Sequence, residues 1–246
     1  MKEDLKFLFI GDSITDGNRS RVGDPNHILG HGFAYSVGAQ LGYQYAELRP
    51  KFYNRGSSGE NSWQIRQRWQ EDALDIAPDV VTILCGINDT FVMTGNDPDP
   101  EHLSTAAFEG HLRYMIESLK QQNPEILIML GVPFFYGNVN DLDTRFQSAG
   151  DKMEQKFTIR FRKVFTSKAE IKTADITIRQ EIVRKLAAEY GTLLLDTPAL
   201  FEECFQRAPM SYWCWDGTHP TCAMHQRITE EWLHLFCNTD FFRQKR

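Results

Sequence analysis

The sequence predicts an α/β fold in which helices cover both faces of a parallel sheet. Short apolar runs alternate with longer segments of helical periodicity along the 246-residue chain, and this alternation is typical of β-α-β units. Crossover connections in such sheets are right-handed, and ligands bind beyond the carboxyl ends of the strands. We therefore expect any functional site at that edge of the sheet.

Each expected strand is a short apolar run, and each expected helix carries apolar residues at helical spacing. In chain order, we expect strands at Leu5–Ile10, Lys51–Tyr53, Val80–Cys85, Ile126–Val132 and Thr192–Leu195. Between and after them, we expect helices at Phe33–Leu41, Ser62–Ile76, His102–Gln121, Ile178–Tyr190 and Thr221–Phe236.

Local signals support the individual elements. A glycine-rich loop precedes the helix at Phe33, and β-branched residues are frequent in the run from Val80. The helix from His102 is amphipathic. Gly191 ends the following helix as a C-cap residue, and Pro220 can stand at the start of the last one.

Length and composition fit one soluble domain over residues 1–246. Hydrophobic residues make up 41% and charged residues 24% of the chain, as in ordinary globular proteins, and the net charge of −6 argues against a nucleic-acid partner. No run approaches the roughly 20 apolar residues of a membrane helix. Leu5–Ile10 is also too short for the apolar core of a signal peptide. We therefore expect a cytoplasmic protein with no membrane partner.

The chain has five cysteines, an odd number, and no C-x-x-C pair. We interpret them as reduced thiols that mostly fill the core. A zinc site from Cys214, Cys222 and His225 is an alternative without a recognised ligand spacing.

A basic segment departs from a minimal fold of this kind. Residues 134–172 show no clear strand period, and the stretch 151–185 holds ten Lys or Arg against five Asp or Glu. We predict a solvated helical excursion at about 134–172. A lid over the site and a contact between subunits are the functional alternatives.

Four short segments, far apart in the sequence, contain the residue types that a serine esterase needs. They are Gly11–Gly17, Asn54–Gly56, Gly86–Asp89 and Asp216–Pro220. The first three follow expected strands, so they should converge on one edge of the sheet. Ser13 is the expected nucleophile, although Gly-Asp-Ser is also an ordinary turn sequence.

His219 and Asp216 supply the base that a serine hydroxyl requires. They lie three residues apart, so one tight turn can bring the carboxylate to the imidazole. That contact would fix the tautomer of the ring and stabilise the imidazolium. An exposed loop histidine beside an unrelated aspartate is the alternative interpretation.

Acyl transfer also needs hydrogen-bond donors for the developing oxyanion. We expect three such donors: the backbone N–H of Ser13, the backbone N–H of Gly56, where glycine allows close approach, and the side-chain amide of Asn88. On its own, Asn88-Asp89 also fits a polar turn after a strand. Its expected position beside Ser13 favours a role in the site.

Together these residues resemble the SGNH, or GDSL-type, esterase and acylhydrolase family, whose serine, glycine, asparagine and histidine match Ser13, Gly56, Asn88 and His219. The resemblance spans nearly the whole chain. It implies a flavodoxin-like, three-layer α/β/α sandwich with a five-stranded parallel sheet. It also implies a triad completed by Asp216 and no metal or organic cofactor. Self-association into a homo-oligomer is left open.

Longer stretches resemble the branch of acetylxylan esterases and related carbohydrate deacetylases: Phe9–Asp16, Leu29–Phe33, Arg68–Asp72, Pro78–Val81, Gly86–Asp89 and Trp215–Pro220. This likeness implies that Trp215 lines a small acyl pocket, with plain packing as the alternative. Asp12 and Phe91 are further candidate substrate-binding residues, Asp12 as a hydrogen-bond acceptor behind the site and not a metal ligand. Nearby aromatic residues could form a sugar-stacking platform, with anchoring of the core or of loops as the alternative for half of them: Trp63, Phe134, Phe135, Tyr136, Tyr212 and Trp213.

We therefore predict a serine esterase that removes short acyl groups, above all acetyl, from an oligosaccharide or small-molecule ester through an acyl-enzyme. A lipid or thioester acylhydrolase would use the same residues on longer acyl chains. An inactive carbohydrate-binding protein is a third hypothesis, and intact Ser13, Asp216 and His219 argue against it.

Overall fold

A five-stranded parallel sheet forms the centre of the protein. The computed structural model describes residues 3–90, 100–136 and 169–244. The strand order is β2-β1-β3-β4-β5, and every neighbouring pair is parallel. The strands are β1 (Lys6–Gly11), β2 (Lys51–Asn54), β3 (Val80–Leu84), β4 (Leu127–Gly131) and β5 (Leu193–Leu195). The predicted α/β fold and its five strands are confirmed.

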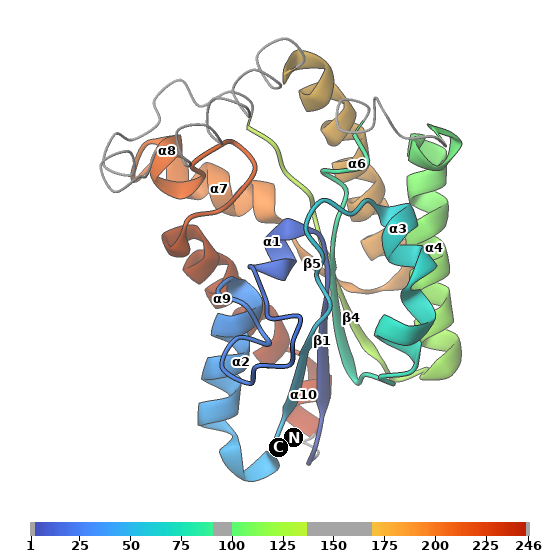
Figure 1. Cartoon of the computed structure of the whole chain (residues 1–246), viewed down its shortest axis with the longest axis vertical. Helices are drawn as coiled ribbons and strands as arrows, with labels where there is room; N and C mark the ends of the chain where they lie inside the picture. The colour runs from blue at the N-terminus through green and yellow to red at the C-terminus, as the bar shows by residue number, and fades with distance from the viewer. Residues whose placement is uncertain (1–2, 91–99, 137–168, 245–246) are drawn as a thin grey trace.

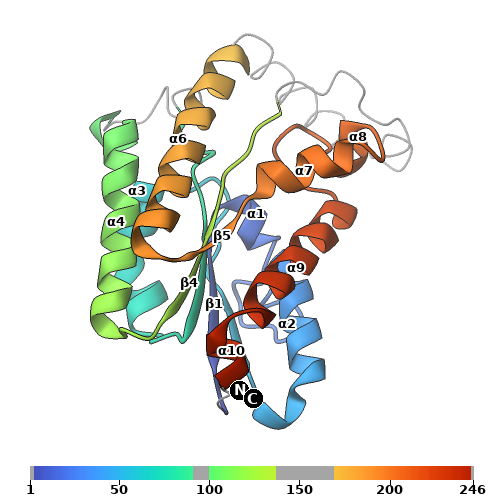
Figure 2. The same cartoon turned by 180° about the vertical axis from the view of Figure 1, so that it is seen from behind.

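Helices cover both faces of this sheet (Figures 1 and 2). One face carries α2 (Phe33–Gln44), α7 (Thr197–Phe205), α8 (Met210–Trp213), α9 (Cys222–Cys237) and α10 (Asp240–Gln244). The other face carries α3 (Ser62–Gln67), a π-helical turn η2 (Gln70–Leu74), α4 (Thr105–Gln122) and α6 (Ala169–Tyr190). Short turns of 3-10 helix occur at η1 (Ala46–Leu48) and η3 (Pro100–Leu103).

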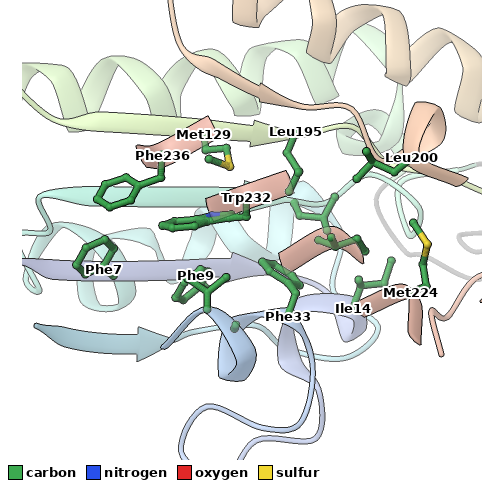
Figure 3. Close-up of a cluster of buried hydrophobic side chains, with 14 of the residues drawn as sticks. Phe7, Phe9, Ile14, Phe33, Met129, Leu195, Leu200, Met224, Trp232 and Phe236 are labelled. Atoms are coloured by element: carbon green, nitrogen blue, oxygen red, sulfur yellow. The ribbon is translucent and has the colours of Figure 1, made fainter. Parts of the chain in front are cut away.

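The alternation of side chains along β1 divides the interior into two cores. Phe7 and Phe9 point to the α2–α9 side, where they pack with Phe33 and Trp232 (Figure 3). The intervening apolar residues of β1 point to the other side and pack under α3, α4 and α6. Because successive side chains of a strand face opposite ways, an unbroken apolar run is the expected signature of a strand covered on both faces.

One buried polar contact fixes α9 on the sheet. The indole N–H of Trp232 donates to the hydroxyl of Thr82 on β3 at 2.8 Å. Both side chains are buried, so this hydrogen bond satisfies two polar groups that the apolar core would otherwise leave unpaired. It helps to hold the helix that follows the His219 turn.

Several helices differ from the sequence prediction. The expected helix Ser62–Ile76 is interrupted after Gln67 and continues as the π-helical turn η2. The expected helix at His102 begins instead at Thr105, because the Ser104 hydroxyl accepts from the N–H of Ala107 at 3.1 Å and caps that end. Helix α6 begins at Ala169, earlier than the predicted Ile178. Four short helices were not predicted: α1 (Ser13–Asp16), α7, α8 and α10.

Most of the predicted basic excursion, residues 137–168, lies outside the described residues, so its role as a lid or contact stays a prediction. At its two ends, Phe134 packs in the core and α6 starts at Ala169. Among the helices that the structure describes, none has the length and apolar character of a membrane span.

The strand order brings the loops after β1 and β3 together at one edge of the sheet. The chain moves from β1 outward to β2 and then back across to β3, so β1 and β3 are neighbours from which the connections leave in opposite directions. In open α/β sheets, ligands bind beyond the carboxyl ends of strands at this kind of switch point. Ser13 follows β1 and Asn88 follows β3, so both lie at this point.

Candidate active site

A short helix presents Ser13 directly after β1. Asp12 caps this four-residue helix, α1, by accepting from the N–H of Ile14 at 3.0 Å, and Gly17 ends it in the left-handed region at φ 51°. Gly11 is required at the strand end, since a Cβ there would lie 2.0 Å from the carbonyl oxygen of Leu84. Ser13 is therefore the first residue of a helix whose N-terminal N–H groups lack partners within the helix.

A closed turn before α9 presents Asp216 and His219. One carboxylate oxygen of Asp216 accepts from the backbone N–H groups of Thr218 and His219 at 2.9 and 2.7 Å. Cys214 and Pro220 form an isolated antiparallel bridge that closes the turn at its base. This internal hydrogen bonding explains why the Asp-Gly-Thr-His sequence holds the two side chains together.

Ser13, His219 and Asp216 form a continuous chain of contacts. The Oγ atom of Ser13 lies 2.9 Å from Nε2 of His219, and Nδ1 of His219 lies 2.6 Å from Oδ2 of Asp216. With the ring proton on Nδ1 donated to the carboxylate, Nε2 is free to accept from the serine hydroxyl. The Asp216 side chain is 8% exposed and that of His219 is 29% exposed. This geometry allows proton transfer from Ser13 to His219.

The predicted donor role of Gly56 needs correction. Its backbone N–H donates to the side-chain oxygen of Asn54 at 2.8 Å, within the same loop. Gly56 also packs against α1 so closely that a Cβ would lie 2.2 Å from the backbone nitrogen of Asp16. This glycine therefore permits close packing of the loop on α1, and its N–H is already committed.

Gly59, three residues further along, has the properties that Gly56 lacks. Its φ is +85°, and a Cβ built on it would meet no atom within 4 Å. Within the described part of the chain, no acceptor is found for its N–H. The nearby sequence signal is the capping box of Asn61 and Gln64, which marks the start of α3 and so the end of the loop that carries Gly59.

Asn88 lies where the sequence predicted, in the loop that follows the end of β3 at Leu84. It is 7% exposed, and its side-chain amide donates to the carbonyl oxygen of Glu60 at 3.0 Å. An amide has two N–H donors, so this contact leaves the second one for another acceptor. The bond also attaches the loop that carries Gly59 to the end of β3.

Asp12 does not face a substrate, contrary to its place among the candidate substrate-binding residues. It is 1% exposed, and its carboxylate accepts the hydrogen bond that caps α1. Burial raises the pKa of its carboxyl to about 7, against the lowering effects of the Ile14 N–H and of His219. The prediction of an acceptor behind the site agrees with this placement.

The candidate aromatic residues occupy different environments. Trp215 is half-buried and stacks on the ring of His219 at a centroid distance of 5.9 Å and 20° between planes. Trp63 stacks on His102 at 3.8 Å, so one face of its ring is already covered. Phe91 lies outside the described residues. Three of the six platform candidates are buried in the interior, as the alternative of core anchoring predicts: Phe134, Phe135 and Trp213.

The alternative zinc site does not assemble. Cys214 and His225 are buried, whereas Cys222 is exposed on α9. Among the residues that the structure describes, no group of three or more His, Cys, Asp or Glu could hold a metal ion. The five cysteines are free thiols and three of them are buried, in agreement with the prediction.

An α/β sheet that holds a serine, an imidazole and a carboxylate in line at its carboxyl edge has the arrangement of a serine hydrolase. Comparison with known proteins gives the family. The model of the GDSL-like lipase/acylhydrolase family matches residues 9–227, and the chain belongs to this family.

Individual relatives agree with this assignment. An acetylxylan esterase from Geobacillus stearothermophilus is 29% identical over 232 residues, which cover 93% of this chain and 92% of that protein. The crystal structure of Axe2, an acetylxylan esterase of the same organism, superimposes with a TM-score of 0.72 at 28% identity, covering 95% of this chain and 94% of that chain. A candidate GDSL-like lipase from Parabacteroides merdae gives a TM-score of 0.75 at 28% identity over 96% of both chains. The chain is thus a carboxylic ester hydrolase.

Proposed function

We propose that this protein is a serine esterase that removes acetyl or similarly short acyl groups from a carbohydrate ester. The observation that carries the proposal is the 2.9 Å contact between Ser13 Oγ and His219 Nε2, with Asp216 on the opposite side of the ring. The reaction type follows from these three groups. The substrate class is supported by the likeness to an acetylxylan esterase over most of the chain.

In the acylation step, His219 Nε2 takes the proton of Ser13 while Ser13 Oγ attacks the ester carbonyl carbon. Asp216 keeps the ring in the correct tautomer and stabilises the imidazolium. The tetrahedral intermediate then collapses and its C–O bond to the sugar breaks. His219 returns its proton to the leaving sugar oxygen, so the products are an alcohol and an acyl-serine.

In the deacylation step, His219 removes a proton from water, and the resulting hydroxide attacks the acyl carbon. Collapse of the second intermediate breaks the bond to Ser13, which recovers its proton from His219, and the free carboxylic acid leaves. The complete reaction consumes one ester and one water molecule and needs no other reactant. The same imidazole therefore acts as base and acid in each half of the reaction.

The oxyanion of both intermediates requires donors that are free before substrate binds. We assign this role to the backbone N–H of Ser13, the backbone N–H of Gly59 and the second amide N–H of Asn88. Gly59 replaces Gly56 in this assignment because the Gly56 N–H is committed to Asn54. Removal of one such donor typically lowers kcat by about 10²–10³.

The proposed preference for short acyl groups rests on Trp215. Its indole stacks beside His219 and is rigid and large, so it would limit the room beyond the carbonyl carbon. A carbohydrate leaving group, no nucleic-acid or membrane partner, and a cytoplasmic location complete the proposal as the sequence predicted it.

The first test compares Ser13→Ala with the wild type on p-nitrophenyl acetate and acetylated xylo-oligosaccharides. The kcat of Ser13→Ala should be lower than that of the wild type by a factor of at least about 10³, since the acyl-enzyme cannot form. Ser36→Ala on α2 is the matched control, because Ser36 is a partly buried serine that has no role in the proposed mechanism. An organophosphonate probe should label the wild type at Ser13. Equal activity of Ser13→Ala and the wild type would refute the proposal.

A second test measures kcat/KM on p-nitrophenyl esters from acetate to dodecanoate. The proposal expects a maximum at acetate and a steep fall beyond butyrate. A maximum at octanoate or longer would reject the short acyl group while leaving the serine mechanism in place, and would favour a lipid or thioester substrate.

A further inference from the structure

Two buried aspartates hold the loop that carries Gly59, here called the Gly59 loop and defined as residues 55–61. Asp16 accepts from Ser58 through both the backbone N–H at 3.0 Å and the hydroxyl at 2.7 Å. Asp89 accepts from Ser62 in the same way, through the backbone N–H at 3.0 Å and the hydroxyl. One aspartate–serine contact therefore lies on each side of Gly59.

The two aspartates come from different parts of the site. Asp16 is the last residue of α1, the helix that begins with Ser13, and Asp89 directly follows Asn88. The first contact thus ties the Gly59 loop to the helix of the nucleophile. The second ties the start of α3 to the strand end that carries Asn88, which itself bonds to the carbonyl oxygen of Glu60.

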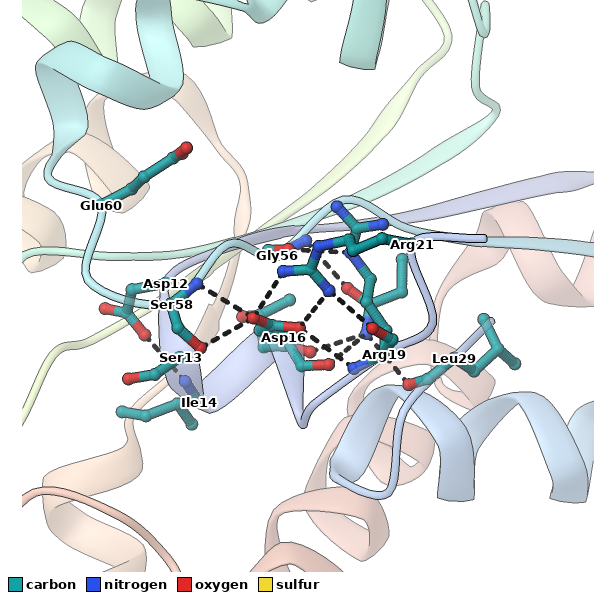
Figure 4. Close-up of polar contacts among 12 residues, drawn as sticks. Asp12, Ser13, Ile14, Asp16, Arg19, Arg21, Leu29, Gly56, Ser58 and Glu60 are labelled. Carbon is teal, nitrogen blue, oxygen red and sulfur yellow. Dashed lines mark hydrogen bonds and ion pairs between the residues drawn. The ribbon is translucent and has the colours of Figure 1, made fainter. Parts of the chain in front are cut away.

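Each aspartate is supported by an arginine. Figure 4 shows Asp16 between Ser58 and Arg21, whose guanidinium donates to both carboxylate oxygens at 2.9 and 2.7 Å. Burial favours the neutral acid, but the hydrogen bonds of Arg21 and Ser58 outweigh it and lower the pKa of Asp16. Behind Asp89, the buried guanidinium of Arg179 donates to the Asp89 carbonyl oxygen at 2.6 Å.

Gly59 itself makes few contacts, and the neighbouring Glu60 is held by Asn88 and by an ion pair with Arg68. Ser58 and Gly59 are exposed, and Gly59 has no neighbouring atom within 4 Å of its Cβ position. The position of the Gly59 N–H therefore depends on the residues that flank it. A hydrogen-bond donor is effective for an oxyanion only within a narrow range of distance, and a misplacement of about 1 Å can cost about 10² in rate.

We propose that Asp16 and Asp89 are positioning residues that set the Gly59 N–H relative to Ser13 and Asn88, through their contacts with Ser58 and Ser62. This inference rests on the proposed esterase function and on the assignment of Gly59 as an oxyanion donor. The role proposed for Asp16 and Asp89 is separate from proton transfer.

The test uses Asp16→Asn. The two carboxylate oxygens of Asp16 accept from Ser58 and Arg21, whereas the amide of asparagine has one acceptor oxygen. On p-nitrophenyl acetate, kcat should fall by about 10- to 100-fold while KM stays within about threefold, since the loss falls on the charged intermediate. Ser58→Ala should lower kcat by about 3- to 10-fold, and Ser58→Thr, which keeps the hydroxyl, should recover most of that loss. Asp75→Asn, an exposed carboxylate, is the matched control.

A double-mutant cycle separates positioning from general stability. In the background of Gly59→Ala, whose positive φ displaces the donor, Asp16→Asn should lower kcat by less than about twofold more, because the effects share one cause. Ser62→Ala tests the second contact in the same way. Since Ser58 is exposed, Ser58→Ala remains a valid test even where Asp16→Asn fails to fold.

Two results would overturn the inference. One is a kcat within twofold of the wild type for both Asp16→Asn and Ser58→Ala. The other is that Asp16→Asn lowers kcat by the same factor in the Gly59→Ala background as in the wild type. An active Ser13→Ala would instead refute the esterase mechanism itself, so the two failures are distinguishable.

Discussion

Asp12→Asn should stabilise the protein at neutral and alkaline pH. Asp12 is 1% exposed, and burial raises the pKa of its carboxyl from 3.8 to about 7. The nearby charge of Asp89 acts in the same direction, while the Ile14 N–H and His219 oppose it. At pH 8 the folded protein must therefore hold a charge in a poorly solvated position. Asparagine caps a helix about as well as aspartate and carries no charge.

The sign and size of the effect follow from linkage. Between pH 3.8 and about 7, the folded state keeps a proton on Asp12 that the unfolded state has lost. The free energy of unfolding therefore falls as pH rises through this window and stays low above it. A difference of about 3 in pKa corresponds to about 4 kcal/mol at 1.36 kcal/mol per unit of pKa. Asp12→Asn should gain up to about this amount at pH 8 and little at pH 4.

Urea unfolding followed by tryptophan fluorescence between pH 4 and pH 8 measures this gain. Asp89, whose pKa burial raises to about 6, contributes in the same direction, so the pH dependence should shrink in Asp12→Asn without vanishing. Asp75→Asn, at an exposed site, should keep the wild-type dependence. The reasoning is refuted if Asp12→Asn and the wild type differ by the same amount at pH 4 and pH 8, or if the variant is less stable at pH 8.

Two further predictions concern the reaction. Asp216→Asn should lower kcat by about 10⁴ with unchanged thermal stability, since an amide no longer holds the His219 tautomer. If steady-state assays show that kcat falls by less than tenfold, Asp216 does not orient the ring. Trp215→Ala should raise the kcat/KM ratio of hexanoate to acetate esters by about 10-fold or more, since hydrophobic pockets discriminate by about 10–200-fold per methylene. An unchanged ratio would place the limit on acyl length elsewhere.

The sheet could be predicted from the sequence because its central strands, β1, β3 and β4, are buried on both sides. Phe7 and Phe9 pack under one helical layer and the residues between them under the other, so β1 appears as an unbroken apolar run. The same reasoning placed Ser13 and Asn88 at a common edge. The short helix α1 could not be predicted, because four residues between glycines give no period. Its capping aspartate was the available signal.

The choice between two nearby glycines shows a limit of sequence reasoning. Gly56 and Gly59 both follow β2, and both allow close approach of the backbone. What distinguishes them is that the Asn54 side chain accepts from the Gly56 N–H, whereas Gly59 projects away from its neighbours with a positive φ. Hydrogen bonds between a side chain and a backbone two residues away depend on a rotamer, and residue type alone does not specify it.

Four aspartates around this site show how environment, more than residue type, decides what a carboxylate does. Asp216 accepts three N–H groups of its own turn, so its oxygens are directed at the His219 ring. Asp16 is held ionised by Arg21 and can accept from Ser58. Asp12 and Asp89 are buried with fewer opposing charges, and their pKa values rise. Negative charge at neutral pH is therefore favoured at Asp16, where it supports the Gly59 loop, and disfavoured at Asp12, the residue before Ser13, where it would repel an oxyanion.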